Sequence, residues 1–222
     1  MSRAASVRPG SCRAGSVAVE FALVIPILIF LLTGLYQMWT LTVVNRELET
    51  VAASIGQMLT QSTTGSVSDD DLAFTASSTM VLFPGILSDA ANKGLSWSDD
   101  IGITISSVVF GQQANGSYQA QVAWSRGTSK RPCGTALSAA ADDAAPSPTT
   151  LPQDLFGAGS LIVVDVVFAY TPSFVPTAFL APATYTYRKS VYLQPRYIAA
   201  PSYITHSSTD ADGGTTICQG YD

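Results

Sequence analysis

The chain has 222 residues, 16 of them acidic and 11 basic, with a formal net charge of −5 and a mean hydropathy of +0.27. The basic residues before position 46 are Arg3, Arg8 and Arg13, and without them 8 basic residues face 16 acidic ones, a formal charge of −8. An acidic remainder with no basic patch argues against nucleic acid as a partner. The length allows one soluble domain of moderate size beside a membrane segment.

Residues 1–15, MSRAASVRPGSCRAG, form a short basic leader. A secretory signal peptide has its small-residue cleavage site after the apolar region. Here no A-x-A site follows residue 33, and the small residues Ala14, Gly15 and Ser16 precede the apolar run. Cleavage at that point would remove the leader and keep the hydrophobic helix.

An uncharged run extends from Phe21 to Asn45 and is long enough to cross the roughly 30 Å hydrocarbon core as one helix. Arginines stay on the cytoplasmic side of a span, so the N-terminus is predicted to be cytoplasmic and the C-terminal domain periplasmic. Pro26 cannot donate a backbone hydrogen bond to the carbonyl of Ala22, which predicts a kink. Ordinary tolerance of Pro in membrane helices is the alternative.

The helix is predicted to continue beyond the membrane, to about residue 62. A helical stripe of apolar residues lies opposite charged and polar ones, and its members are Leu48, Val51, Ile55, Met58 and Leu59. Residues 16–62 are therefore expected to form one transmembrane and amphipathic helix, whose outer half packs on the domain formed by residues 63–222.

The domain 63–222 is predicted to have an α+β fold. Asp69, Asp70 and Asp71 place acids at a helix start, and Pro84-Gly85 ends that helix. In residues 101–105 and 118–124, apolar side chains alternate with polar or small ones. An Asn115-Gly116 turn lies between the two segments, which predicts a hairpin.

Two further strands are expected, at residues 161–170 and 184–193. Residues 136–152, ALSAAADDAAPSPTTLP, have the composition of a low-complexity linker that builds no core. The fold expected is thus the long helix, a short second helix and an antiparallel sheet of about four strands.

Cys12 belongs to the leader, which leaves Cys133 and Cys218 as a pair in the C-terminal domain. That domain is predicted to be periplasmic, in a compartment where disulfides persist. We expect them to form a disulfide that ties the polar C-terminal tail to the domain. Two free thiols are the alternative.

The sequence contains no nucleophile elbow, nucleotide-binding glycine loop or H-E-x-x-H motif. His206 is the sole histidine in the sequence and is interpreted as a surface residue of the polar tail. A solvated helix cap is favoured over a metal site for the three aspartates. No metal, cofactor or enzymatic activity is predicted.

Glu20 is the one acid within the first turns of the apolar helix. A carboxylate among lipid tails or packed helices is costly unless it is paired. Cleavage after Gly15 would make Glu20 the fifth residue and give Ser16 a positively charged amino group. Pairing of Glu20 with the Ser16 amine of a neighbouring subunit would then favour assembly and fix the register. The alternative is that Glu20 lies at the level of the lipid headgroups.

Residues 15–37, GSVAVEFALVIPILIFLLTGLYQ, resemble the N-terminal TadE-like segment of the pseudopilins of the tight-adherence (Tad, or Flp) pilus system. The block from Leu161 to Arg196 is similar to the end of such proteins. Glu20 favours this family over the related TadG-like proteins, which usually lack the acid. Gln37 departs from the pattern, because family members often have a second acid there.

The resemblance implies a minor pilin or pseudopilin of a type IV-like pilus, processed after Gly15 by a prepilin peptidase and held in the bacterial inner membrane. Its partners would be other pilins and the Tad assembly machinery, and its final place could be the pilus or cell surface. Two alternatives stay open, namely an unprocessed, signal-anchored protein that binds a ligand or envelope proteins, and an exported enzyme.

Overall fold

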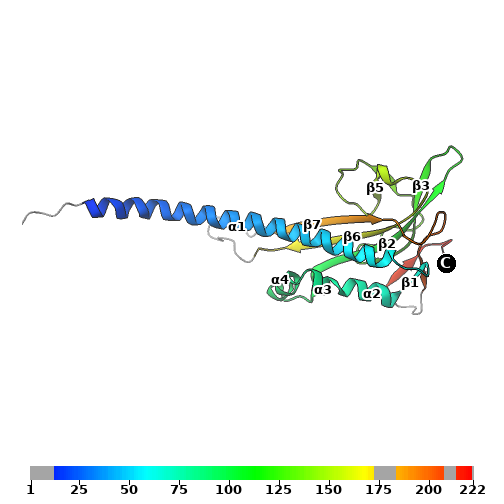
Figure 1. Ribbon diagram of the computed structural model, residues 1–222, viewed down its shortest axis with the longest axis horizontal. Helices are drawn as coiled ribbons and strands as arrows, with labels where there is room; N and C mark the ends of the chain where they lie inside the picture. Colours follow the sequence, from blue (N-terminus) through cyan, green and yellow to red (C-terminus); the bar gives the residue numbers. More distant parts are fainter. Residues whose placement is uncertain (1–12, 173–183, 208–213, 222) are drawn as a thin grey trace, which may run out of the picture. The chain divides into compact units, whose positions relative to one another are not determined.

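A computed structural model describes residues 13–172, 184–207 and 214–221, with the backbone alone for residues 13–18. The leader residues 1–12 lie outside the described residues. The chain divides into two compact units, Met1–Val43 and Val44–Asp222. One helix, α1 (Arg13–Thr60), enters both units, so its residues from Val44 onward belong to the C-terminal unit (Figure 1).

The C-terminal unit is built on a five-stranded antiparallel sheet with the order β7-β6-β2-β3-β9. Its strands are β2 (Ile101–Gln112), β3 (Tyr118–Gly127), β6 (Gly159–Tyr170), β7 (Tyr185–Leu193) and β9 (Thr215–Ile217). The predicted α+β class and the hairpin β2–β3 are confirmed. Gly116 adopts a φ of 84° in the hairpin turn, where the Asn115 side chain accepts a hydrogen bond from the Ser117 backbone at 3.0 Å.

Helices cover one face of the sheet. The side chains of α1 that face the sheet follow helical spacing and are almost fully buried, and they are Leu48, Val51, Ala52, Ile55 and Leu59. They share one core with the even-numbered side chains of β6, with Leu72 and Ile86 from the shorter helices, and with Phe83 from a link between two of those helices. The ring of Phe83 meets that of Phe168 edge-on, with centroids 5.3 Å apart. Four residues of the predicted stripe thus pack on the domain, whereas the fifth, Met58, is 40% exposed.

The shorter helices are α2 (Asp69–Ser77), α3 (Thr79–Leu82), α4 (Gly85–Lys93) and α5 (Trp97–Asp100). The predicted helix start is confirmed, since Ser68 caps α2 and the Asp71 side chain bonds back to the Ser68 backbone. The predicted end at Pro84-Gly85 is confirmed as well, since α3 ends at Leu82 with Phe83 as its C-cap. Pro84 then begins the separate helix α4, because proline fits a helix start, where its missing N–H is not needed.

The segment predicted to be a core-less linker, residues 136–152, covers the opposite face of the sheet. It contains β4 (Ser138–Ala140) and β5 (Thr150–Pro152), which pair in parallel, followed by the 3-10 helix η1 (Gln153–Leu155). Leu137 and Leu151 are buried in a second core with Val108, Val122 and Val163. Two apolar side chains at the ends of a polar segment suffice here, because the sheet already supplies the rest of the core.

The C-terminal tail is tied to the sheet and to α2. Strand β8 (Thr205–Ser207) pairs in parallel with β1 (Ser66–Ser68), and β9 extends the sheet. The indole of the buried Trp124 donates to the Ile204 carbonyl at 2.7 Å. The predicted disulfide between Cys133 and Cys218 is confirmed, with Cα atoms 5.2 Å apart.

Candidate functional site in helix α1

The first half of α1 carries a continuous apolar surface. From Val19 to Thr60 the helix is long and apolar enough to cross a membrane, and none of its most apolar 18-residue window is buried. Val19, Phe21 and Leu23 are each more than 60% exposed, and exposure of large apolar side chains continues to Trp39. An apolar surface of this length needs lipid or other helices around it. The helix indicates a membrane-anchored protein with a C-terminal domain.

The residues predicted to act in processing and assembly all lie in this part of α1. Gly15 and Ser16 are helical, with only their backbone described. Glu20 lies one turn further along the helix and is exposed among apolar neighbours. Pro26 lies inside a helix that continues to Thr60, and the kink there stays a prediction. Cleavage and the pairing of Glu20 with Ser16 likewise stay predictions.

The second half of α1 presents a polar outer face. Arg46, Glu49, Thr50 and Gln57 are exposed, while the apolar side of the helix is covered by the sheet. Lys189 of β7 reaches Glu49 at 3.6 Å. From Val44 onward the helix therefore offers polar groups to any neighbour, and its extended apolar surface lies before that point.

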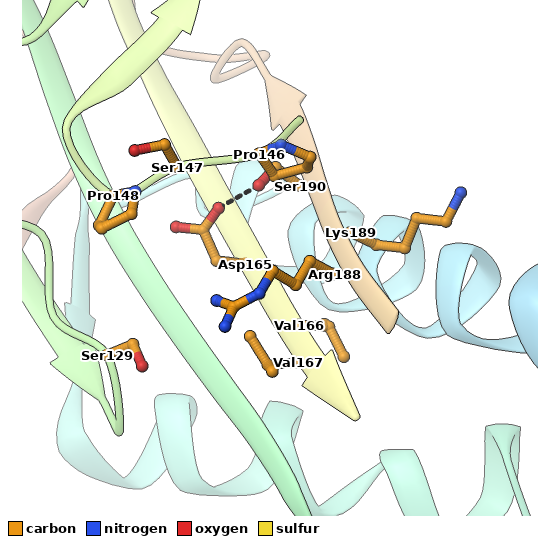
Figure 2. Close-up of a pocket in the computed structure, with 10 residues that line it drawn as sticks. All are labelled: Ser129, Pro146, Ser147, Pro148, Asp165, Val166, Val167, Arg188, Lys189 and Ser190. Atoms are coloured by element: carbon orange, nitrogen blue, oxygen red, sulfur yellow. Dashed lines mark hydrogen bonds between the residues drawn. The ribbon is translucent and has the colours of Figure 1, made fainter. Parts of the chain in front are cut away.

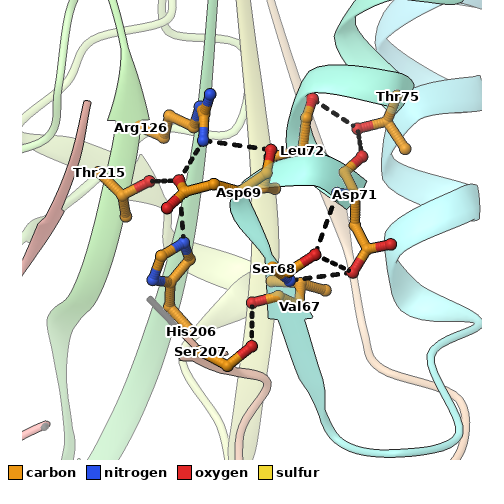
Figure 3. A network of polar contacts seen from close by, with 10 residues as sticks. All are labelled: Val67, Ser68, Asp69, Asp71, Leu72, Thr75, Arg126, His206, Ser207 and Thr215. Atoms are coloured by element: carbon orange, nitrogen blue, oxygen red, sulfur yellow. Dashed lines mark hydrogen bonds and ion pairs between the residues drawn. The ribbon is translucent and has the colours of Figure 1, made fainter. Parts of the chain in front are cut away.

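Sequence reasoning missed a buried polar cluster around Asp69 (Figure 3). Its carboxylate accepts hydrogen bonds from Arg126, from the Thr215 hydroxyl at 2.8 Å and from His206 Nε2 at 3.2 Å. Burial opposes ionisation of Asp69, but the Thr215 hydrogen bond and the charges of His206 and Arg126 together lower its pKa. His206 is buried rather than a surface residue, because the pairing of β8 with β1 brings it to the start of α2.

A second buried charge pair lies on the other face of the sheet. The Arg131 side chain is fully buried and donates two bonds to Asp165 of β6, at 2.8 and 2.9 Å. Asp165 also accepts from the Ser190 hydroxyl in a small cavity of about 30 Å³ (Figure 2). A cavity of this size holds about one water molecule, and two of its lining groups, Asp165 and Ser190, already bond to each other. We interpret this pair as a structural tie between β6 and the segment after β3.

The third polar group is centred on Lys93. Its ammonium lies 2.5 Å from Asp89 and 2.6 Å from Asp100, donates to the Ala169 carbonyl and sits over the Phe168 ring. Burial lowers the pKa of Lys93, but the hydrogen bonds and charges of the two aspartates outweigh it and raise the pKa overall. Burial raises the pKa of Asp100. These contacts fasten α4 to β6.

No group of three or more His, Cys, Asp or Glu side chains that could hold a metal ion occurs among the described residues. The three polar clusters join secondary-structure elements through ion pairs, although Asp69 Oδ2 and His206 Nδ1 are buried without a hydrogen-bond partner in the part of the chain that the structure describes. Among the described residues, the first half of α1 carries a long run of exposed apolar side chains, from Val19 to Trp39.

Comparison with known proteins points to the same segment. The family model described as TadE-like protein matches residues 15–55, from Gly15 at the predicted cleavage point to Ile55 in the packed part of α1. Neither the curated proteins nor the solved structures gave a match. The chain therefore carries a TadE-like segment at residues 15–55, which confirms the resemblance predicted from the sequence and indicates a Tad pilus-associated protein.

Proposed function

We propose that this chain is a minor pilin or pseudopilin that takes part in assembly of a Tad (Flp) type IV-like pilus. The observation that carries the proposal is the exposed apolar half of α1, which coincides with the TadE-like match and contains Glu20. The inner membrane holds this helix until it packs against the helices of other pilin subunits. The soluble domain then lies on the periplasmic side or at the pilus surface.

Processing at the leader prepares the helix for assembly. The three arginines before the apolar run keep the leader in the cytoplasm. A prepilin peptidase cuts between Gly15 and Ser16, which removes those arginines and leaves a helix that begins with a free amino group. The proposed division of the chain is therefore a leader at 1–15, an assembly helix at 16–62 and a domain at 63–222.

Glu20 gives the assembly its register. Within packed apolar helices a lone carboxylate is destabilising by several kcal/mol, whereas a carboxylate paired with an ammonium group costs much less. The Ser16 amine of a neighbouring subunit supplies that ammonium group. A subunit shifted along the axis by even one helical turn loses the pair, so the correct register is the favoured one.

The structure of the second half of α1 limits where apolar packing between subunits occurs. Of the stripe, Leu48, Val51, Ile55 and Leu59 are already buried in the domain, and Met58 alone is exposed. Contacts between subunits through the apolar helix surface therefore involve residues before Val44. Beyond that point neighbours would meet the polar face that carries Arg46 and Glu49.

The test compares Glu20→Ala with Glu47→Ala, which makes the same change on the same helix beyond the apolar run. Membrane insertion is measured by fractionation and protease protection, and assembly by co-purification with the other pilus subunits. We expect both variants to insert normally, with Glu20→Ala alone losing co-purification by about tenfold or more, since 1.4 kcal/mol corresponds to a factor of ten. Normal co-purification of Glu20→Ala would contradict the pairing and favour an unprocessed, signal-anchored binding protein.

A further inference from the structure

An open groove of about 520 Å³ lies where α1 ends, beside the start of α2. Leu59 and Val67 form its buried floor, each 3% exposed. Met58 and Phe74 line it and remain 40% and 71% exposed. Hydroxyl groups of the turn at 62–66 complete the wall, and Ser62 and Thr64 already bond to the Ser66 carbonyl. The groove therefore offers an apolar slot with a largely satisfied polar wall.

The charge of the groove is negative. Asp71 lines it, the exposed Asp70 precedes Asp71 in the chain, and neither Lys nor Arg is among the lining residues. Hydrogen bonds from the backbone and side chain of Ser68 lower the pKa of Asp71, so this carboxylate is ionised at neutral pH. An apolar slot beside a carboxylate fits an aromatic side chain that has a cation next to it.

The same chain exposes such a pair. Tyr197 is 66% exposed, Arg196 beside it is exposed, and both follow β7. The Arg196 backbone N–H donates to the Thr60 carbonyl at 3.1 Å. That bond fixes the pair next to the end of α1, close to where the groove begins. Donor and acceptor surfaces thus lie side by side on one domain, which is the arrangement that a two-fold contact requires.

We propose that this end of the domain is a self-association surface, in which Tyr197 of one copy enters the groove of a second copy and Arg196 faces Asp71 there. Each copy gives one tyrosine and receives one. Tyr and Arg are the residue types that most often dominate binding at such contacts. The contact uses residues of the C-terminal unit alone, so it goes beyond the proposed role of the apolar helix and does not depend on it.

The test is thiol cross-linking of the full chain in detergent micelles, with Cys12→Ser to remove the leader thiol. One copy carries Thr63→Cys in the groove and the other carries Ala199→Cys near Tyr197. Both sites are exposed, and both docking side chains stay intact. A short bismaleimide should cross-link these two copies in high yield. In the control, Ala91→Cys, an exposed site on α4, replaces Thr63→Cys, and the cross-linking yield should be much lower.

Substitutions then test the chemistry of the contact. Tyr197→Ala should lower the cross-linked yield about tenfold, while Tyr185→Ala, which truncates another exposed tyrosine, should leave it unchanged. Arg196→Gln and Asp71→Asn should each lower it severalfold, and Asp71→Asn keeps an acceptor for the Ser68 cap. High salt should act in the same direction.

Two results would overturn the proposal of a self-association surface. The first is a cross-linking yield between the Thr63→Cys and Ala199→Cys copies that is no higher than the yield of the Ala91→Cys control. The second is a yield that neither Tyr197→Ala nor Arg196→Gln lowers. An intact Cys133–Cys218 disulfide and an unchanged circular dichroism spectrum show that each variant has folded. Loss of this contact with normal co-purification of pilus subunits would leave the proposed function standing.

Discussion

Replacing Asp165 by leucine tests the buried pair with Arg131. Asp165 is 15% exposed and Arg131 is fully buried, so the substitution leaves a guanidinium without its carboxylate in the second core. Arg131 keeps its bonds to the carbonyls of Pro148 and Thr150, at 3.4 and 3.2 Å. The fold remains possible, but the arginine becomes a buried charge without a counterion.

The expected loss is large relative to the stability of a domain. Breaking a buried ion pair by removing one partner costs about 3–5 kcal/mol, and domains unfold with only about 5–15 kcal/mol. The two remaining carbonyl bonds to Arg131 place the loss near the lower end. We expect the free energy of unfolding to fall by about 3 kcal/mol.

The assay is urea unfolding of the full chain in detergent micelles, followed by tryptophan fluorescence, since Trp124 is completely buried. Asp154→Leu, on an exposed acid, serves as the matched control and should cost less than about 0.5 kcal/mol. The double variant Arg131→Met with Asp165→Leu removes both charges and should recover at least half of the loss. A loss below about 1 kcal/mol for Asp165→Leu would refute the reasoning.

Three further changes probe the rest of the domain. Asp69→Asn should lower the free energy of unfolding of the domain by about 2 kcal/mol at pH 7. The native pKa of Asp69 lies below its unfolded value of about 4, so the stability difference between the two proteins should persist above about pH 4 and shrink as the pH falls below it. A pH-independent difference in urea unfolding would contradict this. Gly127→Ala should cost about 3 kcal/mol or more, because Gly127 has a φ of 130° and an added Cβ would lie 2.1 Å from the Ile103 carbonyl oxygen; an unchanged thermal midpoint would count against the close approach. Reduction of Cys133–Cys218, which are 85 residues apart, should cost roughly 4–5 kcal/mol on loop-entropy grounds, and identical unfolding with and without reductant would argue against it.

The elements that the sequence predicted are those fixed by local periodicity. The stripe from Leu48 to Leu59 repeats at helical spacing, and the strands around Asn115-Gly116 alternate, so each pattern is readable without knowledge of the rest of the fold. The predicted disulfide followed from cysteine number and compartment. These features cover the long helix, the sheet and the family segment, including Glu20.

The features that the sequence did not predict depend on contacts between distant residues. Asp69 meets His206, 137 positions later, through the pairing of β1 with β8. Arg131 bonds to Asp165, 34 positions later, because the sheet brings these two segments together. An isolated Asp, His or Arg carries no local signal of its partner. The polar composition around Asp69 and His206 therefore suggested solvent exposure, although the two side chains are buried together.

Residues 136–152 show the limit of composition as a guide. Their Ala, Asp, Pro and Ser content indicated a linker, yet Leu137 and Leu151 close the second core. Large apolar residues at the two ends of a polar segment were the available signal. The burial of these apolar residues can be inferred only once it is known that one face of the sheet has to be covered.

The N-terminal sequence of the protein purified from its native membrane tests the central claim most directly, because an assembling prepilin-type subunit must lose its leader while a permanent anchor need not. We predict that the mature chain begins at Ser16, with Glu20 as its fifth residue. A mature chain that still begins at Met1 would contradict processing and the pairing of Glu20 with a Ser16 amino group.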